Sequence, residues 1–275
     1  MAKLCFSILI SLLLCGLAYG QYAAGIDSRG SLSRTVDGYV HRISEQHWRT
    51  ATGCVLWLNF NESGTTNWDY SHNTNYATGG LLWTNAAGGC GYSTGAADST
   101  SIIIADEDLT LSNQSFTVMC WIYPRTIDSQ DRFGKYDGAL GLTWHFQGFA
   151  VSTNEGAETN VLAFTYDRVG GTRRLECREQ LWNVSNEWTH LAVIGNAANT
   201  TLTFVVNGMT CTNLFESSGP WLDATGWVSF GGITAGTYND WLIDDFRVYR
   251  INLGTNEVTE IFNTETNVHI PRSSM

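Results

Sequence analysis

An acidic residue interrupts the apolar alternation of residues 241–250, WLIDDFRVYR. Alternate residues of a β-strand share a face, so Asp244 is expected in one apolar row with Phe246. Asp245 and Arg247 fall on the other, mixed face, which water is expected to reach. A carboxylate buried without a partner costs several kcal/mol or takes up a proton. The pattern therefore predicts that a partner compensates the charge of Asp244.

Carboxylate pairs are the other chemistry to look for, because a glycoside hydrolase needs two of them flanking the scissile bond. Asp106 and Asp108 lie at alternate positions, but in a loop-like setting, and Glu176 and Glu179 point to opposite faces of a strand. His190, in WTHLAV, has no Ser or Cys partner in a readable motif, and no H-E-x-x-H sequence occurs. The sequence therefore predicts a protein that is not an enzyme.

The first twenty residues have the pattern of a secretory signal peptide. Lys3 supplies the positive charge, residues 4–17 form the apolar run, and Ala18 and Gly20 are the small residues before the cleavage point. The apolar run is too short to span a bilayer, and no later segment is as apolar over 18 residues. We therefore expect a secreted, extracellular protein without membrane insertion.

The chain that remains after cleavage is acidic. Removing Lys3 takes the formal charge from −11 to −12 and leaves Lys135 as the one lysine. This balance argues against nucleic acid and anionic membrane surfaces as partners. It is compatible with divalent cations and neutral sugars.

Cysteines and glycosylation motifs fit an exported chain. The cysteines after residue 20 are odd in number, so at least one is free or bonded to another chain, and no C-x-x-C spacing indicates zinc. We expect Cys177 and Cys211 to pair, since both lie in consecutive short strands of one region, and Cys120 is expected as a free thiol in a core strand. The N-x-Ser/Thr motifs that predict glycosylation in turn-like stretches are at Asn61, Asn113, Asn183 and Asn199.

Short β-rich runs with turn residues between them predict an all-β sandwich or barrel. Asn207-Gly208 and the RVGG stretch at 168–171 predict tight hairpins. One short helix is expected over 254–263, where apolar residues recur at helical spacing. Residues 21–50 lack clear alternation, and we interpret them as an N-terminal extension. The expected strands cover 54–60, 100–105, 115–124, 138–153, 160–167, 172–181, 188–195, 201–207, 226–233 and 240–250.

In this order, the segments resemble the LamG-like jelly roll of the concanavalin A-like lectin/glucanase superfamily. The matching pieces are VLWLNFNESGTTNWDYSHNTN, SFTVMCWIYP, EWTHLAVIGNAANTTLTFVVNGMTC and the closing block at 227–263. The resemblance covers about residues 53 to 263 and implies a two-sheet antiparallel jelly-roll sandwich. It divides the chain into a signal peptide (1–20), an extension (21–50), a jelly-roll domain (51–263) and a C-terminal tail (264–275).

The resemblance also implies a metal. In related jelly rolls, the Asp that matches Asp244 often helps to hold a structural calcium, together with carbonyl oxygens of the opening turn. Calcium accepts six to eight oxygen ligands in loose geometry. We therefore expect a structural calcium, with Asp244, Asn61 and Asp69 as its side-chain ligands, although Asn61 stands where the family usually has an acid. The alternative is that backbone N–H groups satisfy Asp244.

The function that the resemblance implies is extracellular recognition of a glycan or protein without catalysis. Loops on a rigid sandwich carry recognition, and the stretches 130–138 and 215–223 are polar, contain Gly and carry aromatic or Arg anchors. One alternative is a structural component of a matrix or coat. Another is a glycoside hydrolase of the same superfamily, although the glucanase strand motif E-x-D-x-E is missing. The expected ligand-binding residues are Arg132, Phe133, Tyr136 and Trp221.

Overall fold

The structure, a computed structural model, is described here for residues 23–26, 32–36, 39–43, 53–60, 66–69, 71, 76–78, 82–86, 89–93, 102–106, 109–124, 132–137, 141–152, 158–168, 171–177, 187–215, 221–222, 226–230 and 241–269. The chain divides into two compact units, Met1–Thr52 and Gly53–Met275. In the first unit, β1 (Ala23–Ile26), β2 (Leu32–Val36) and β3 (Tyr39–Ile43) form an antiparallel sheet in the order β1-β2-β3. The predicted signal peptide lies outside the described residues.

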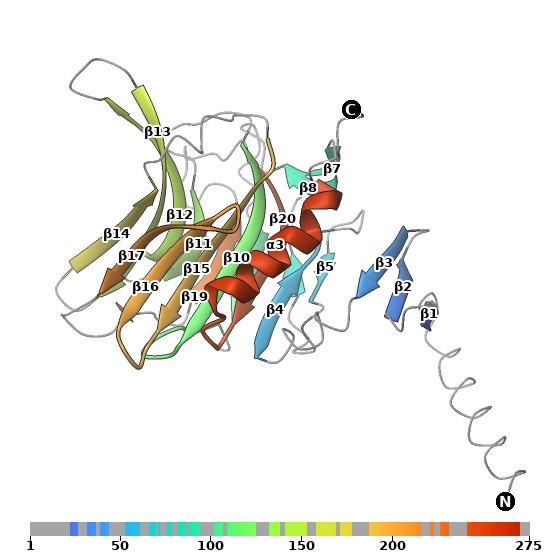
Figure 1. The fold of residues 1–275 in the computed structure, drawn as a ribbon, viewed down its shortest axis with the longest axis horizontal. Coiled ribbons are helices and arrows are strands. Elements are labelled where there is room, and N and C mark those ends of the chain that lie inside the picture. The colour runs from blue at the N-terminus through green and yellow to red at the C-terminus, as the bar shows by residue number, and fades with distance from the viewer. Residues whose placement is uncertain are drawn as a thin grey trace, which may run out of the picture. The chain divides into compact units, whose positions relative to one another are not determined.

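The second unit contains two antiparallel sheets (Figure 1). Sheet I has the order β17-β16-β15-β10-β20-β8-β7, with β4 also paired to β20. Sheet II has the order β14-β13-β12-β11-β19-β9-β6-β5, with β18 paired to β13. The predicted all-β, two-sheet antiparallel sandwich is confirmed. The strands of sheet I are β4 (Cys54–Leu58), β7 (Leu82–Ala86), β8 (Gly89–Ser93), β10 (Phe116–Pro124), β15 (Thr189–Asn196), β16 (Thr201–Val206), β17 (Met209–Phe215) and β20 (Trp241–Tyr249). Those of sheet II are β5 (Thr66–Trp68), β6 (Tyr76–Thr78), β9 (Ile102–Asp106), β11 (Arg132–Asp137), β12 (Gly141–Ser152), β13 (Glu158–Arg168), β14 (Gly171–Cys177), β18 (Trp221–Leu222) and β19 (Gly226–Phe230).

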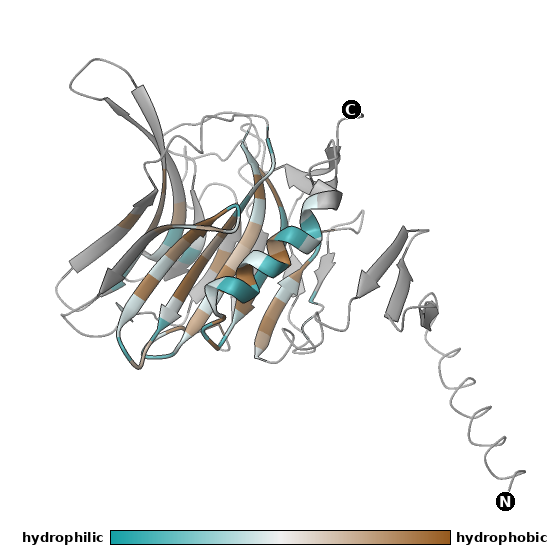
Figure 2. Cartoon of the chain, viewed as in Figure 1, coloured by the Kyte–Doolittle hydropathy of each residue, from teal (hydrophilic) through white to brown (hydrophobic). Residues whose placement is uncertain are grey.

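An apolar core joins the two sheets, and both supply large side chains to it. Phe230 of sheet II meets Phe246 of sheet I edge-on, with ring centroids 4.8 Å apart. Full burial of one such side chain stabilises the fold by about 1.5–3 kcal/mol. Figure 2 shows brown, apolar residues along the strands of sheet I. Core members include Leu56, Val118, Ile122, Val193 and Phe204 from sheet I, and Trp144, Phe146, Phe164, Tyr166 and Val228 from sheet II.

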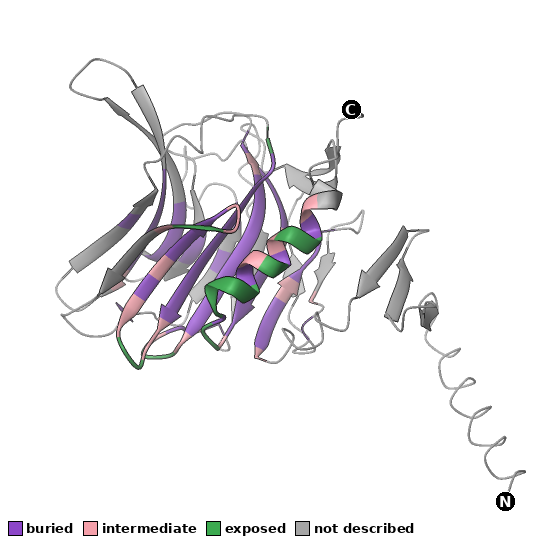
Figure 3. Cartoon of the chain, viewed as in Figure 1, coloured by how far each residue is buried: buried purple, intermediate pink, exposed green. Residues whose placement is uncertain are grey.

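One helix, α3 (Thr255–His269), lies across the outer face of sheet I (Figure 1). Val258 and Ile261 pack into an apolar cluster with residues of that sheet, and the opposite side of the helix is exposed (Figure 3). The helix begins with a cap in which Glu257 Oε2 accepts the Gly254 N–H at 2.7 Å. The predicted helix is confirmed and runs further, so residues 264–269 of the expected tail are helical.

The two predicted hairpins are also confirmed. Asn207 and Gly208 have φ angles of 48° and 73° and connect β16 to β17, as a two-residue turn with positive φ requires. Thr259 of α3 donates its hydroxyl to the Gly208 carbonyl at 2.8 Å, which ties the helix to this turn. At the other hairpin, Arg168 of β13 pairs with Gly171 of β14.

One loop prediction is wrong. Residues 132–137 of the expected binding loop 130–138 form β11, which pairs with β12 on one side and β19 on the other. Gly134 suggested a turn, but it serves close strand packing, because a Cβ there would lie 2.1 Å from the Trp144 carbonyl oxygen. Lys135 is fully buried in the same strand. Pairing on both sides outweighs the turn-like composition.

Candidate functional site

A β-bulge in β20 changes the position of the acidic residues. Trp121 of β10 pairs with Asp244 and Met119 pairs with Arg247, so β20 contains one extra residue over this stretch. Asp245 takes the left-handed conformation that such a bulge uses, with φ 46°.

The bulge also shifts the alternation of β20. Trp241 and Ile243 before it, and Phe246 and Val248 after it, all lie in the core between the sheets. The predicted row of Asp244 with Phe246 is therefore wrong. Asp244 instead stands opposite Trp121, on the side of sheet I that faces α3.

Asp244 is buried and accepts the Asp245 backbone N–H at 2.8 Å. Asp69 is also held by protein donors: its Oδ1 accepts the N–H groups of Trp57 and Ser71 at 2.9 and 2.7 Å, and its Oδ2 accepts the Ser71 hydroxyl at 2.7 Å. Asp69 thereby satisfies the Trp57 N–H of the short strand β4. Its own backbone forms an isolated β-bridge with the next residue of that strand, Leu58.

The calcium prediction rests partly on residues without a described position. Asn61 lies outside the described residues. Within the described ranges, no group of three or more His, Cys, Asp or Glu side chains is arranged to hold a metal ion. The groups of Trp57 and Ser71 that donate to Asp69 give this carboxylate a structural role without a metal. Calcium therefore stays a prediction that depends on Asn61 and on carbonyl groups of the opening turn.

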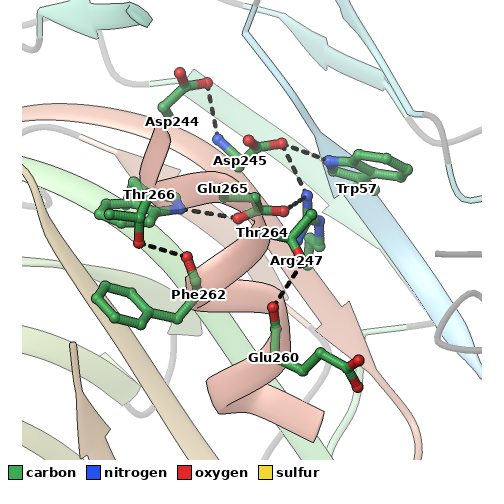
Figure 4. Close-up of polar contacts among 10 residues, drawn as sticks. Trp57, Asp244, Asp245, Arg247, Glu260, Phe262, Thr264, Glu265 and Thr266 are labelled. Carbon is green, nitrogen blue, oxygen red and sulfur yellow. Dashed lines mark hydrogen bonds and ion pairs between the residues drawn. The ribbon is translucent and has the colours of Figure 1, made fainter. Parts of the chain in front are cut away.

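A buried ion cluster lies between β20 and α3 (Figure 4). The Arg247 side chain is 2% exposed, and its Nη2 lies 3.1 Å from Asp245 Oδ1 and 2.5 Å from Glu265 Oε1. Its guanidinium group stands over the Trp57 ring, 4.4 Å from the centroid. The indole N–H of Trp57 donates to Asp245 at 2.8 Å, and that of Trp121 donates to Glu265 at 2.9 Å. The cluster thus fastens α3 to β20, β10 and β4.

The electrostatics of the cluster keep it ionised. Burial alone would lower the pKa of Arg247, but the carboxylates of Glu265 and Asp245 outweigh burial and raise this pKa above its usual range. Glu265 Oε1 meets Arg247 as an ion pair. The expectation that water reaches Asp245 and Arg247 alike is wrong for Arg247. This arrangement is suited to holding the helix in place.

The free cysteines of the described part are buried and chemically quiet. Burial raises the pKa of the Cys54 thiol from 9.0 to about 12, and burial also raises the pKa of Cys120. Neither forms a thiolate at neutral pH, so neither is a nucleophile. Cys211 is disulfide-bonded, and its strand β17 contacts β14, which ends at Cys177. The pairing of Cys177 with Cys211 stays a prediction, because the Cys177 side chain is outside the described residues.

Trp221 does not fit its predicted role as a ligand anchor. It is 3% exposed and packs in the core, where its ring meets Phe116 edge-on at 5.3 Å. Its indole N–H donates to the carbonyls of Leu111 and Gln114 at 2.8 and 3.1 Å. Trp221 therefore holds the turn before β10. The other expected ligand residues, Arg132, Phe133 and Tyr136, belong to β11, and their side chains lie outside the described residues.

Sheet II carries polar side chains that the sequence reading missed. His145 alternates in β12 with Trp144 and Phe146, whose side chains lie in the core, so His145 belongs to the outer face of sheet II. It stands opposite Gly134 on β11 and opposite Thr165 on β13. The signal was present in the stretch TWHFQ, where polar and apolar residues alternate. Thr143, His145 and Thr165 are all buried.

Thr165 has an unused polar atom. Its Oγ1 is buried, and within the described part of the chain no group forms a hydrogen bond with it. Buried polar groups normally have a partner. Because this oxygen is itself buried, a ligand reaches it only where the groups that cover it move aside.

Comparison with known proteins places the chain in a family. Residues 94–259 match the family described as the concanavalin A-like lectin/glucanases superfamily. The chain belongs to this superfamily. No curated protein matches it.

Several solved structures share the fold. The binding domain of Paraclostridial Mosquitocidal Protein 1 is 18% identical, with a TM-score of 0.60 over 79% of this chain and 53% of that chain. A botulinum neurotoxin type C structure, described as depending on two ganglioside molecules for cell entry, is 15% identical, with a TM-score of 0.57 over 80% and 53%. The binding domain of botulinum neurotoxin DC, solved with rat synaptotagmin II, is 14% identical, with a TM-score of 0.56 over 78% and 52%.

At these identities the likeness shows the fold alone, and the chain matches about half the length of these structures. None of the helices in the described ranges is long and apolar enough to cross a membrane.

Proposed function

We propose that this chain is an exported, non-catalytic binding module that recognises an extracellular glycan or protein. The observation that carries the proposal is the structural use of three acidic residues. Asp245 and Glu265 neutralise Arg247 beneath α3, and Asp69 braces β4. Hydrolysis of a glycoside needs two carboxylates that face the substrate together. Asp245, Glu265 and Asp69 are thus committed to holding elements in place.

The family and the fold support the same proposal. The superfamily includes lectins by its description, and the similar structures named above are binding domains by theirs. Those proteins contribute only an architecture here. They support a sandwich that presents a recognition surface without a reaction centre.

The surface that we assign to recognition is the outer face of sheet II. Part of the outer face of sheet I is covered by α3, which packs on residues of β4, β10, β15, β16 and β20. The outer positions of sheet II include His145 and Thr165, whose polar groups suit the hydroxyl groups of a neutral sugar but are buried, so a sugar reaches them only where the groups that cover them move aside. These groups favour a glycan over an apolar ligand.

One argument for the alternative, a disulfide-linked matrix or coat component, is weakened. That alternative drew on the odd cysteine count, but the free thiols of Cys54 and Cys120 are buried. Neither links to another chain while the domain is folded. Cys90 has its side chain outside the described residues.

A glycan array probed with the secreted chain, with and without a calcium chelator, tests the proposal. We expect saturable binding to a limited set of glycans and no release of reducing sugar from the same glycans. A parallel screen against extracellular proteins covers the protein branch of the proposal. Steady turnover of a polysaccharide that stops on replacing one Asp or Glu would overturn it. A chain that binds neither glycan nor protein and forms disulfide-linked multimers would favour the matrix alternative.

A further inference from the structure

Two of the N-x-Ser/Thr motifs lie in turns that the structure describes. Asn113 precedes β10, in the sequence Asn113-Gln114-Ser115, and Asn199 lies in the turn between β15 and β16, followed by Thr200 and Thr201. Both asparagines are exposed. Asn61 and Asn183 are outside the described residues.

The two turns are neighbours at one end of the sandwich. β10 and β15 pair antiparallel, with Phe116 opposite Gly195, so the start of one strand meets the end of the other. A direct hydrogen bond also joins the turns, because the Ala197 N–H donates to Ser115 Oγ at 3.1 Å. Asn199 therefore lies two residues after Ala197, which contacts the Asn113 motif directly.

Each turn is held in place by its own contacts. The Trp221 indole N–H binds the carbonyls of Leu111 and Gln114 on either side of Asn113. In the other turn, Asn199 Oδ1 accepts the Thr201 hydroxyl at 2.6 Å and its N–H at 3.3 Å. These bonds use the oxygen of the Asn199 amide. An N-linked sugar attaches to the amide nitrogen, so the turn is compatible with modification.

We infer that Asn113 and Asn199 both carry N-linked glycans, and that the pair shields this end of the sandwich from partners. The inference rests on the export that the proposed function includes. In the reaction, the Nδ2 atom of Asn attacks C1 of the first sugar of a lipid-pyrophosphate-linked oligosaccharide. The C1–O bond to the pyrophosphate breaks, the N–C1 bond forms, and the Nδ2 proton leaves with the lipid pyrophosphate.

The shield has a consequence for the binding module. Glycans are bulky and hydrated, and two of them on adjacent turns cover the end of the sandwich where β10 begins and β15 ends. Recognition is then left to other surfaces, which agrees with the assignment of the outer face of sheet II.

The first test uses the full chain produced in a eukaryotic secretory cell line, once with residues 1–20 and once with these replaced by an established secretion signal. Glycopeptide mass spectrometry reports occupancy at each asparagine separately. Asn113→Gln and Asn199→Gln each remove one glycan, and both glycans are absent from the double variant. The matched controls are Asn196→Gln, in the same turn as Asn199 but outside any motif, and Gln114→Ala, which keeps the Asn113 motif intact. Neither control changes occupancy.

The second test measures the shield. Ala198→Cys places a thiol on the exposed turn between the two glycans, and Met209→Cys places one at the opposite end of β16, where Met209 is 47% exposed. A polymer-linked maleimide should label position 198 several-fold faster after enzymatic removal of the glycans. The rate at position 209 should not change.

The outcomes separate this inference from the proposed function. Secretion with the replaced signal but not with residues 1–20 would overturn the export proposal, and with it the glycans of the natural chain, even where both asparagines are modified. Secreted protein in which Asn113 or Asn199 is unmodified overturns the paired glycans. Equal labelling at position 198 before and after glycan removal overturns the shield.

Discussion

Asp245 occupies a left-handed conformation, with φ 46°, between two residues with opposite tasks. Asp244 is buried and accepts the Asp245 N–H, and Phe246 enters the core. The extra residue of the bulge is what allows an acid and an aromatic ring, two positions apart, to face opposite sides of sheet I. It also brings the Asp245 carboxylate to Arg247, where the cluster below α3 forms.

Removing the cation of this cluster should be costly. Arg247→Met leaves the buried carboxylate of Glu265 and the half-buried carboxylate of Asp245 without their cation, and breaking a buried pair in this way costs about 3–5 kcal/mol. Urea denaturation measures the loss. Arg250→Met is the matched control, because Arg250 directly follows β20, is only half-buried, and keeps its backbone bond to Gly53. A loss for Arg247→Met no larger than that of the control would contradict a fastening role for the cluster.

The buried thiols and Tyr249 predict a stability that falls at high pH. Burial raises the pKa of Cys54 to about 12, and burial raises the pKa values of Cys120 and Tyr249 as well. Stability is full below the unfolded-state values, such as 9.0 for Cys54, and is lost as the pH rises through the interval up to the folded values. The slope is roughly 1 kcal/mol per pH unit for each titrating group.

Denaturant titrations between about pH 8 and about pH 11 measure this slope, because thiols and phenols of the unfolded chain titrate in this range. Cys120→Ala should reduce the slope, and the cavity left by its buried sulfur should lower stability by a constant amount below the thiol range. If the free energy of unfolding is flat over this interval, the thiols are not buried in solution.

Calcium binding is a further prediction that concerns a single residue, Asp244. If calcium is held at 100 times its dissociation constant, it adds about 2.7 kcal/mol to stability. We then expect a chelator to lower the melting temperature of the wild-type chain, and Asp244→Ala to lower it and abolish the chelator effect. A wild-type melting curve that does not move with chelator would leave the Asp245 N–H as the partner that Asp244 needs.

The sequence showed that Asp244 needs a partner, but not which one. A strict alternation of two was assumed for β20, and one extra residue in a bulge reverses every assignment beyond it. Trp221 was misjudged for a different reason. Its surroundings read as a polar loop, and the carbonyls that bind its indole belong to a turn 110 positions away in the chain.

At the scale of elements, the spacing of Val258, Ile261 and Phe262 was enough to predict α3 and its buried side. The polar sequence after residue 263 did not predict that the helix continues there. Glu265 is charged, and only the distant Arg247 and Trp121 make its burial favourable. β11 shows the converse, because a Gly-bearing polar stretch became a strand through pairing on both sides.

Position 208 of the turn under α3 should tolerate a side chain poorly. Gly208→Ala places a Cβ at a φ of +73° and 2.9 Å from Phe262 Cδ1, so we expect a loss of about 1–2 kcal/mol or more. Gly254→Ala is the control, since the nearest atom to its Cβ is Glu257 Oε2 at 3.4 Å, an ordinary contact. Thermal melting of both variants measures the difference. Equal melting temperatures would show that the hairpin and the helix are not packed as described.

For the whole molecule, the two outer faces of the sandwich differ. The face of sheet I is closed by α3 through apolar contacts and the ion cluster. The outer positions of sheet II carry Thr143, His145 and Thr165 instead. The sequence predicted the sandwich, because its strands and turns are local signals. It did not predict this difference, because the cross-strand neighbours of His145 come from separate strands.

Thr165→Val separates binding from folding at this face. The Thr165 hydroxyl is buried and forms no hydrogen bond within the described part of the chain. Replacing it by an apolar group of the same shape should therefore leave stability unchanged or raise it slightly. If glycan binding exposes this buried hydroxyl and uses it, affinity for the glycans found on the array should fall about tenfold, which corresponds to about 1.4 kcal/mol. Calorimetric titration gives the affinity and thermal melting gives the stability.

Thr210→Val, at an exposed position of β17 in sheet I, is the control and should change neither. Unchanged affinity in Thr165→Val, with the control also unchanged, would remove this hydroxyl from the recognition surface and place the ligand elsewhere on the sandwich.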